Sequence, residues 1–142
     1  MIDLKQKMVS SLLIRADVKY RRAVSKILEP YQLTILQFET MRLLDQNGQI
    51  IGTKFIKDNL TNPDIAISNV LDELSARELI IKDRALSNRR KVEIRLTPLG
   101  KLIIDKIEEI PPETCLFGKI KKEELEQLKR LLIKIIKILD CD

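Results

Sequence analysis

Residues 79–96 carry a β-hairpin pattern in a chain whose other apolar residues recur mostly at helical spacing. A short β-prone run occupies 79–81, and residues 92–96 alternate between apolar and charged side chains, as in a half-buried strand. The segment 85–91 between them is predicted to form the hairpin tip. Only four glycines occur among the 142 residues, which favours helices over a turn-rich β fold. The pattern predicts a mainly helical α+β chain with one small hairpin.

Helices are predicted on both sides of the hairpin from the spacing of apolar residues and from capping signals. Their expected ranges are 4–28, 35–44, 53–59, 61–77, 98–110 and 121–139. Thr34 and Thr97 precede two of them as N-cap candidates, and Asn47-Gly48 is expected to stop the second helix. Phe55 and Ile56 are expected to point inward. Two helices joined by a short turn before the hairpin indicate a helix-turn-helix.

The helix predicted over 61–77 begins with the strongest start signal. Residues 61–64 supply an N-cap candidate, a proline suited to the first helical position and the first-turn acid Asp64. Its expected inward stripe is spaced three and four apart and consists of Ile67, Val70, Leu71 and Leu74. The stripe leaves Ile65, Ala66, Ser68, Asn69 and Asp72 on the other faces of the helix.

Composition argues against an enzyme or a metal site. The chain has no histidine, which removes the commonest general base and the commonest zinc ligand. Its two cysteines, Cys115 and Cys141, are far apart and are expected to be free thiols. No cofactor is predicted. No apolar run approaches the ~20 residues that span a bilayer, and no signal-peptide pattern is present, so we expect a cytoplasmic protein.

Positive charge is concentrated around the hairpin. Residues 75–101 contain eight Lys or Arg against three Asp or Glu, which equals the net charge of +5 of the whole chain. Such a segment suggests an anionic partner met at a defined place, although a solvated basic surface would give the same count. Arg89, Arg90 and Lys91 at a hairpin tip would be well placed to reach phosphates. A winged helix-turn-helix that binds double-stranded DNA accounts for this placement.

The same residues resemble the MarR family of bacterial transcriptional regulators over nearly the whole chain. The resemblance rests on Leu33-Thr34-x-x-Gln37-Phe38, on Leu74-x-x-x-x-Leu79-Ile80, and most strongly on Arg84-x-x-x-Asn88-Arg89-Arg90 followed by Leu96-Thr97-x-x-Gly100. It implies a single domain over 1–142, with a winged-helix region over about 33–97 and dimerisation helices over about 4–28 and 98–140. It also implies a homodimeric repressor that binds a pseudo-palindromic operator.

The resemblance assigns DNA contacts residue by residue. Phosphate contacts are expected from the wing and from helix starts: Arg84, Arg89, Arg90, Lys91, Thr34, Gln37 and Lys54. Base reading would fall to Ser68 and Asn69, with Ile65 and Ala66 available to thymine methyl groups. A solvated helix face is the alternative for Ser68 and Asn69. Asp64, Ser87 and Asn88 complete the predicted DNA-binding set.

Three residues or groups depart from the family pattern. Asn88 stands where the family usually has a wing aspartate, and Glu78 stands where a glycine usually ends the recognition helix, the helix predicted over 61–77. That helix is also acidic, with Asp64, Asp72 and Glu73. The acids leave open an alternative function, a winged-helix module that binds protein rather than DNA.

Dimerisation and regulation are also implied by the resemblance. A heptad seam from Leu125 to Leu139 is wider than one face of a small monomer would bury, which favours a partner subunit. Family members often respond to small aromatic or phenolic effectors, so a small-molecule effector is a further expected partner. Its binding residues are unknown, because core packing is the favoured role for each of the candidates Tyr20, Tyr31, Phe38 and Phe117.

Overall fold

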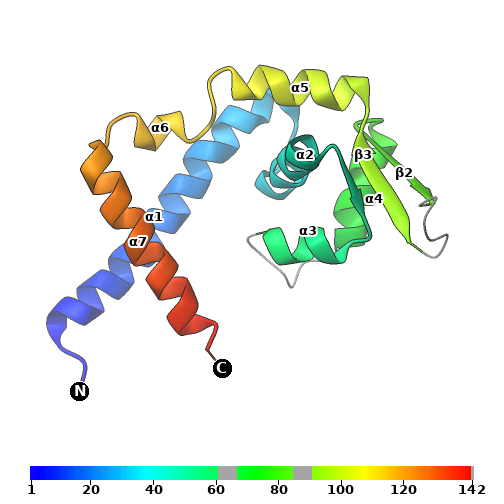
Figure 1. The fold of residues 1–142 in the computed structure, drawn as a ribbon. Helices are drawn as coiled ribbons and strands as arrows, with labels where there is room; N and C mark the ends of the chain where they lie inside the picture. Colours follow the sequence, from blue (N-terminus) through cyan, green and yellow to red (C-terminus); the bar gives the residue numbers. More distant parts are fainter. Residues whose placement is uncertain (61–66, 85–90, 142) are drawn as a thin grey trace.

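The computed structural model describes residues 1–60, 67–84 and 91–141 of the chain. Most of the chain is helical, and a small antiparallel sheet lies at one edge of the molecule (Figure 1). The elements are α1 (Leu4–Leu28), the 3₁₀ turn η1 (Glu29–Tyr31), α2 (Ile35–Asn47), β1 (Gln49–Ile51), α3 (Lys54–Asn59), α4 (Ile67–Ala76), β2 (Ile80–Arg84), β3 (Val92–Leu96), α5 (Pro98–Glu108), α6 (Thr114–Phe117) and α7 (Lys122–Leu139). The predicted fold class, mainly helical with a small hairpin, is confirmed.

Capping residues begin the first two helices as their sequences suggest. Asp3 accepts a hydrogen bond from the Gln6 backbone N–H at 2.8 Å, and the Gln6 side chain accepts one from the Asp3 backbone. Thr34 and Gln37 form the same reciprocal capping box at the start of α2. The predicted start of α2 is therefore confirmed, whereas its end lies at Asn47, three residues later than expected, with Gly48 at φ +72° as its C-cap.

The sheet has three strands in the order β1-β3-β2. Strands β2 and β3 pair antiparallel, with Arg84 opposite Val92, and form the predicted hairpin. Strand β1 adds Ile50 opposite Ile94 on the other side of β3 and was not predicted. With only Gln49–Ile51 in the strand, an alternating pattern is too short to recognise, and its pairing comes from a strand over forty residues away.

The core lies between the helices and one face of this sheet. Ile67, Val70, Leu71 and Leu74 of α4 are all buried in it, as predicted. On α3 only Ile56 is buried, whereas Phe55 is 42% exposed, so the prediction for Phe55 was wrong. Burying one side chain per turn is enough to anchor a helix of six residues.

The end of α4 closes without the glycine that the family pattern would place there. Glu78 adopts a left-handed conformation with φ +60°. Its N–H donates to the Ser75 carbonyl at 3.0 Å, and the Leu79 N–H donates to the Leu74 carbonyl at 3.0 Å. These two bonds define a Schellman motif, in which glycine is favoured because a Cβ destabilises left-handed backbone.

Replacing Glu78 with glycine should therefore stabilise the protein. We expect Glu78→Gly to raise the free energy of unfolding by about 0.5–1 kcal/mol, because it removes the strain of a side chain at positive φ. Ala76→Gly, two residues earlier in ordinary helical backbone, should lower it by a similar amount. Urea denaturation measures the change in the free energy of unfolding for both variants. If the two substitutions changed it in the same direction, the left-handed conformation of Glu78 would be contradicted.

The Leu96-Thr97-x-x-Gly100 motif joins the end of α4 to the start of α5. Thr97 caps α5 by accepting from the Gly100 N–H at 3.0 Å, and its hydroxyl donates to the Glu78 carbonyl at 2.6 Å. The Thr97 N–H donates to the Leu79 carbonyl at 3.0 Å. A Cβ built at Gly100 would lie 2.2 Å from that same carbonyl oxygen. The close approach of α5 to the Leu79 backbone therefore requires glycine.

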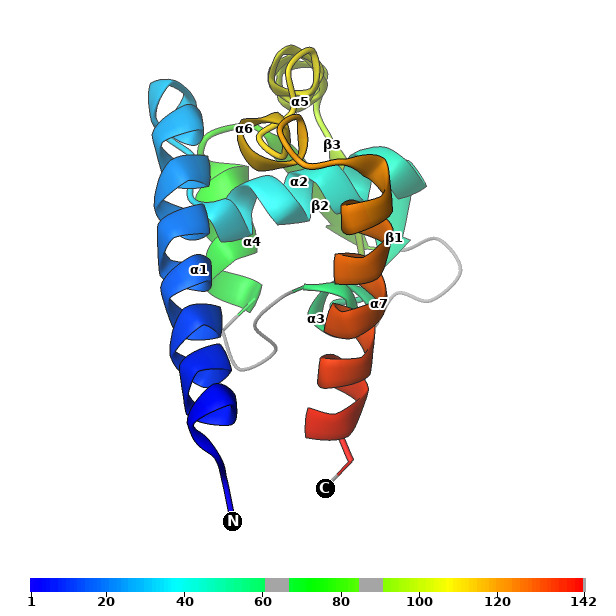
Figure 2. The ribbon, with the colours of Figure 1, turned by 90° about the vertical axis from the view of Figure 1, so that its left-hand side faces the viewer.

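Two helices extend away from the core with exposed apolar side chains. Helices α1 and α7 overlap in Figure 1, but Figure 2 shows them apart, with the chain termini at the same end. No residue of α7 is buried. The apolar side chains exposed on the two helices include Leu4, Met8, Val9, Leu12, Ile14, Leu131, Ile133, Ile136, Ile138 and Leu139. In the described ranges, no helix is both long and apolar enough to cross a membrane.

Candidate nucleic-acid interface

Helix α4 presents a polar face on the side opposite its buried stripe. Ser68 and Asn69 are both exposed there. The core packing of Ile67 and Val70 on either side of them fixes the rotation of the helix, so the two polar side chains point away from the protein. Their short hydroxyl and amide groups can both donate and accept hydrogen bonds, as base edges in a major groove require.

The acids of α4 are engaged within the protein. Asp72 forms an ion pair with Lys82 of β2, and the Glu73 carboxylate accepts a hydrogen bond from the Gln37 side-chain amide at 2.7 Å. The first pair also places β2 beside the exposed side of α4. The negative charge that suggested a protein-binding module is therefore partly offset by Lys82, and Glu73 has a role in holding α4 against α2.

The C-terminal end of α4 is held by Arg77, for which no role was predicted. The Arg77 guanidinium donates to the Tyr31 and Gln32 carbonyls at 2.8 and 2.7 Å. Those carbonyls belong to the turn after α1, where Gln32 is left-handed with φ +53°. A cation just past the last turn of a helix often bonds backbone carbonyls, so the sequence did mark Arg77. It could not identify the partner carbonyls, because they are more than forty residues away. Arg77 thus ties α4 to the end of α1.

Thr34 and Gln37, predicted to contact phosphates, form hydrogen bonds within the protein. Thr34 caps α2, and Gln37 is buried with its carbonyl oxygen bonded to the Thr34 N–H at 3.1 Å and its amide bonded to Glu73. A direct phosphate contact would require Gln37 to leave both partners. Within the chain Gln37 positions α4 relative to α2, and its phosphate contact stays a prediction. Thr34 is exposed, and so is Lys54 in the first turn of α3.

The described ends of the wing strands carry exposed cations. Arg84 ends β2 and Lys91 immediately precedes β3, and both side chains are exposed. Neither forms an ion pair with any residue that the structure describes. In contrast, Arg95 in the middle of β3 is paired with Glu93 at 3.3 Å and with Asp83 at 3.7 Å. Arg84 and Lys91 are therefore available to meet an external anion.

The remaining predicted contacts lie outside the described residues. They are Asp64, Ile65 and Ala66 at the expected start of α4, and Ser87, Asn88, Arg89 and Arg90 at the expected wing tip. Their roles stay predictions. The described part places Ser68 and Asn69 on α4, Arg84 and Lys91 at the ends of the wing strands, of which β2 is joined to α4 by an ion pair, and Lys54 on α3.

Comparison with known proteins agrees with this geometry. No family model matches the chain. The chain is 25% identical to an uncharacterised HTH-type transcriptional regulator, YhbI of Bacillus subtilis, over 84% of this chain and 79% of that protein. It is 24% identical to the HTH-type transcriptional regulator MgrA of Staphylococcus aureus, over 97% of this chain and 93% of MgrA.

Solved structures share the fold over nearly the whole chain. AbsC, a MarR family transcriptional regulator from Streptomyces coelicolor, superposes with a TM-score of 0.89 at 16% identity, covering 100% of this chain and 99% of AbsC. A MarR variant from Escherichia coli complexed with operator DNA gives a TM-score of 0.78 at 20% identity, covering 94% and 99% of the two chains. A MarR transcription factor from Planctomyces limnophilus gives 0.68 at 28% identity, covering 93% and 98%. The chain thus shares the winged helix-turn-helix fold of MarR-family transcriptional regulators, and its sequence is similar to those of HTH-type transcriptional regulators.

Proposed function

We propose that the chain is a sequence-specific DNA-binding transcriptional regulator that acts in the cytoplasm as a homodimeric repressor on a pseudo-palindromic operator. The observation that carries the proposal is the pairing of an exposed polar face on α4 with exposed cations on the adjoining wing strands. Phosphate contacts supply affinity and base-edge contacts supply specificity, and this surface offers groups for both. The related MarR structure that contains operator DNA supports the same use of the fold.

Each DNA-contacting residue has a defined role in this proposal. Ser68 and Asn69 read base edges, while Arg84, Lys91 and Lys54 neutralise phosphates. The residues outside the described ranges extend both groups as predicted, with Ile65 and Ala66 at the bases and Arg89 and Arg90 at the backbone. The winged-helix region is proposed to span 33–97.

The homodimer is proposed to form through 4–28 and 98–140. Helix α7 has no buried residue within the chain, and Leu131 and Ile138 are 58% and 62% exposed. On α1, Leu4, Val9 and Ile14 are at least 61% exposed. Exposed apolar surface on this scale is characteristic of a protein interface. Two copies of the chain would bury it, and would place two winged helices on two half-sites.

A small-molecule effector is proposed to bind where the dimerisation helix α1 meets the winged-helix region. A cavity of about 190 Å³ opens there between α1, α2 and the connection to α6. Its apolar and aromatic lining consists of Tyr20, Val24, Ile35, Phe38 and Pro112. Burial raises the pKa of Tyr20, helped by the nearby Glu113 and Cys115. The Tyr20 hydroxyl can donate a hydrogen bond to a ligand in this cavity.

Salt-dependent DNA binding tests the proposed interface. Selection from genomic fragments first supplies an operator. Arg84→Ala should then weaken binding to operator and to non-specific DNA alike, and should lower the slope of log affinity against log salt by about 0.9 for each phosphate that a subunit no longer neutralises. Asn69→Ala should instead weaken operator binding by about tenfold with little effect on non-specific DNA.

Lys106→Ala is the matched control, because Lys106 is an exposed cation on α5, outside the proposed DNA interface, and sedimentation checks that the variant remains a dimer. It should change neither the affinity nor the salt slope. If Arg84→Ala behaved like Lys106→Ala, the wing would not contact phosphates. If the wild-type chain bound no duplex DNA at low salt, the proposed function would be wrong.

A further inference from the structure

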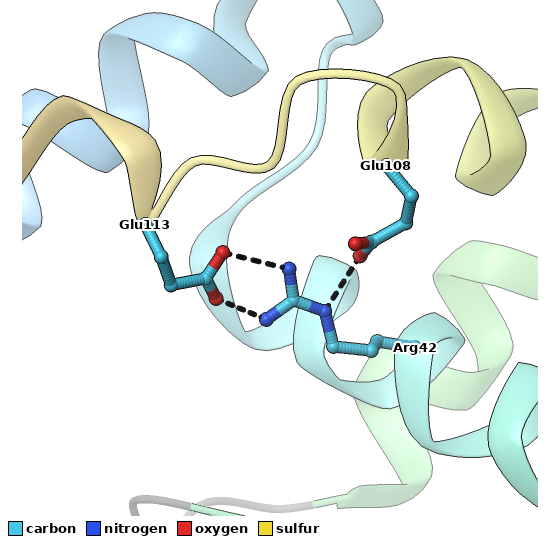
Figure 3. Close-up of polar contacts among 3 residues, drawn as sticks. All are labelled: Arg42, Glu108 and Glu113. Carbon is cyan, nitrogen blue, oxygen red and sulfur yellow. Dashed lines mark hydrogen bonds and ion pairs between the residues drawn. The ribbon is translucent and has the colours of Figure 1, made fainter. Parts of the chain in front are cut away.

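Arg42 of α2 forms ion pairs with two acids on the segment that leads out of α5. Its Nε donates to Glu108 at 2.7 Å, and its two terminal nitrogens donate to the two carboxylate oxygens of Glu113, one of them at 3.1 Å (Figure 3). The guanidinium also stacks over the ring of Phe38, 4.3 Å from its centroid. This cluster of Arg42, Phe38, Glu108 and Glu113, the Arg42 clasp, is therefore fixed by geometry as well as by charge.

The clasp is stronger than an ordinary surface ion pair. The Arg42 side chain is only 25% exposed, and those of Glu108 and Glu113 are 33% and 38% exposed, so solvent screens them incompletely. Burial on its own would lower the pKa of Arg42, but the bonds to Glu113 and Glu108 raise it above its ordinary value. The Arg42 hydrogen bond holds the pKa of Glu113 below its ordinary range. Each charge favours the charged form of its partner.

The position of the clasp in the fold matters more than its strength. Glu108 is the last residue of α5, and Glu113 is the N-cap of α6. The four residues between them include Pro111 and the buried Pro112. At this connection the chain leaves the body, residues 35–108, and enters the arm, residues 114–139 (Figure 1). Arg42 belongs to the body and bonds acids on both sides of the connection.

The arm has little buried surface within one chain. No residue of α7 is buried, and no residue of α6 is buried. The ring of Phe117 in α6 packs at 5.9 Å from the ring of Tyr20 in α1. Within the described ranges, this ring pair and the Arg42 clasp connect the start of the arm to the rest of the molecule.

We propose that Arg42 is the positioning residue that fixes the angle between the arm and the body, and thereby sets the spacing of the two recognition helices in the dimer. The second half rests on the proposed function, because it requires a dimer joined through the arms. If α7 packs on a partner, the angle at the Arg42 clasp decides where each α4 lies relative to the dimer axis. Half-site spacing on DNA would follow from that angle.

The chain offers a matched control for the clasp. Lys101 of α5 also bonds an acid of α2, Asp45, at 2.6 Å, and is paired with Asp105 at 3.0 Å. It joins the same two helices as the Arg42–Glu108 pair, but its two acids both belong to the body. A general loss of α2–α5 packing should affect Lys101→Met and Arg42→Met alike. An effect on arm position should appear only in Arg42→Met and Glu113→Gln.

A distance measurement within one chain tests the first half of the proposal. Spin labels are attached to the native Cys141 at the end of the arm and to Gln46→Cys, an exposed position on α2, in a Cys115→Ser background. Labelled chain is diluted with excess unlabelled chain, so that pulsed electron–electron double resonance reports the intrachain distance. We expect a narrow distribution for the parent and for Lys101→Met. Arg42→Met and Glu113→Gln should broaden it to about twice the width, because the arm samples more angles.

Unchanged distributions in both clasp variants would overturn the proposal. Circular dichroism and thermal unfolding of each labelled protein confirm that the body is folded. A variant that fails this check is replaced by Arg42→Lys, which keeps the charge but cannot bond Glu113 with two parallel hydrogen bonds. Broadening in Arg42→Lys then supports the proposal, and a parent-like distribution overturns it.

Operators with altered half-site spacing test the second half of the proposal, that Arg42 sets the spacing of the two recognition helices. The wild type should prefer its selected spacing over one lengthened by two base pairs by about tenfold, and Arg42→Met should reduce that preference to about threefold or less. Lys101→Met should keep the wild-type preference, and an unchanged preference in Arg42→Met would overturn this half. Failure of the wild type to bind any operator would overturn the proposed function instead, while the intrachain distances would still decide the role of Arg42.

Discussion

Replacing Leu131 and Ile138 together with aspartate should convert the protein to a monomer and weaken operator binding by about a hundredfold or more, because binding two half-sites from one dimer multiplies affinity. The two residues lie seven positions apart on one side of α7, and both are largely exposed in the single chain. Aspartates there would face the apolar surface of a partner and would have to be desolvated. Analytical ultracentrifugation measures the mass, and titration of labelled operator measures the affinity.

The body should remain folded in this variant, because neither residue contributes to its core. Lys122→Asp with Lys129→Asp is the matched control: these residues are also seven apart and exposed on α7, but are charged in the native chain and do not line the surface that contains Leu131 and Ile138. The control should remain a dimer despite its larger change in charge. A dimeric Leu131→Asp, Ile138→Asp protein would show that α7 is not in the interface.

Replacing Gly100 with alanine should destabilise the body by about 3 kcal/mol, at the upper end of the usual cost of overpacking, because the neighbour is rigid. The added Cβ would lie 2.2 Å from the Leu79 carbonyl oxygen and 3.2 Å from a Leu96 methyl carbon. The Leu79 carbonyl is bonded to the Thr97 N–H and cannot retreat without breaking that bond. Denaturant titration gives the free energy of unfolding.

The general effect of alanine in α5 must be separated from this clash. Alanine has a higher helix propensity than glycine, so a substitution without steric conflict would be neutral or stabilising. Lys106→Ala in the same helix supplies that baseline. If Gly100→Ala were as stable as Lys106→Ala, the close approach of α5 to the end of α4 would not exist in solution.

Local sequence signals predicted most of the fold because they act over a few residues. The capping box of Thr34 and Gln37, the Thr97 cap and the alternation over 92–96 each specify an element without help from elsewhere. Strand β1 and the four-residue helix α6 carry too few residues for any periodic signal. Their existence depends on neighbours that the fold brings to them.

The proposed DNA interface was predictable only in part, because local signals reveal exposure but not contacts between distant residues. The exposure of Ser68 and Asn69 follows from the buried stripe of α4, and the stripe was evident in the sequence. The internal role of Gln37 was not, because its partner Glu73 is 36 residues away. Arg42 is 66 and 71 residues from its two acids, and no local pattern marks such a contact. Arg89 and Arg90 remain predictions from the family resemblance.

The hydrogen bonds at the end of α4 have a consequence for local unfolding of the protein. Leu79 donates its N–H to α4 while its carbonyl accepts from Thr97, and Thr97 in turn bonds the Glu78 carbonyl and caps α5. A fluctuation that frays the end of α4 must therefore break bonds that also hold the return of β3 and the first turn of α5. We therefore expect α4, the end of β3 and the first turn of α5 to open as one cooperative unit, so that each protects the others against local unfolding.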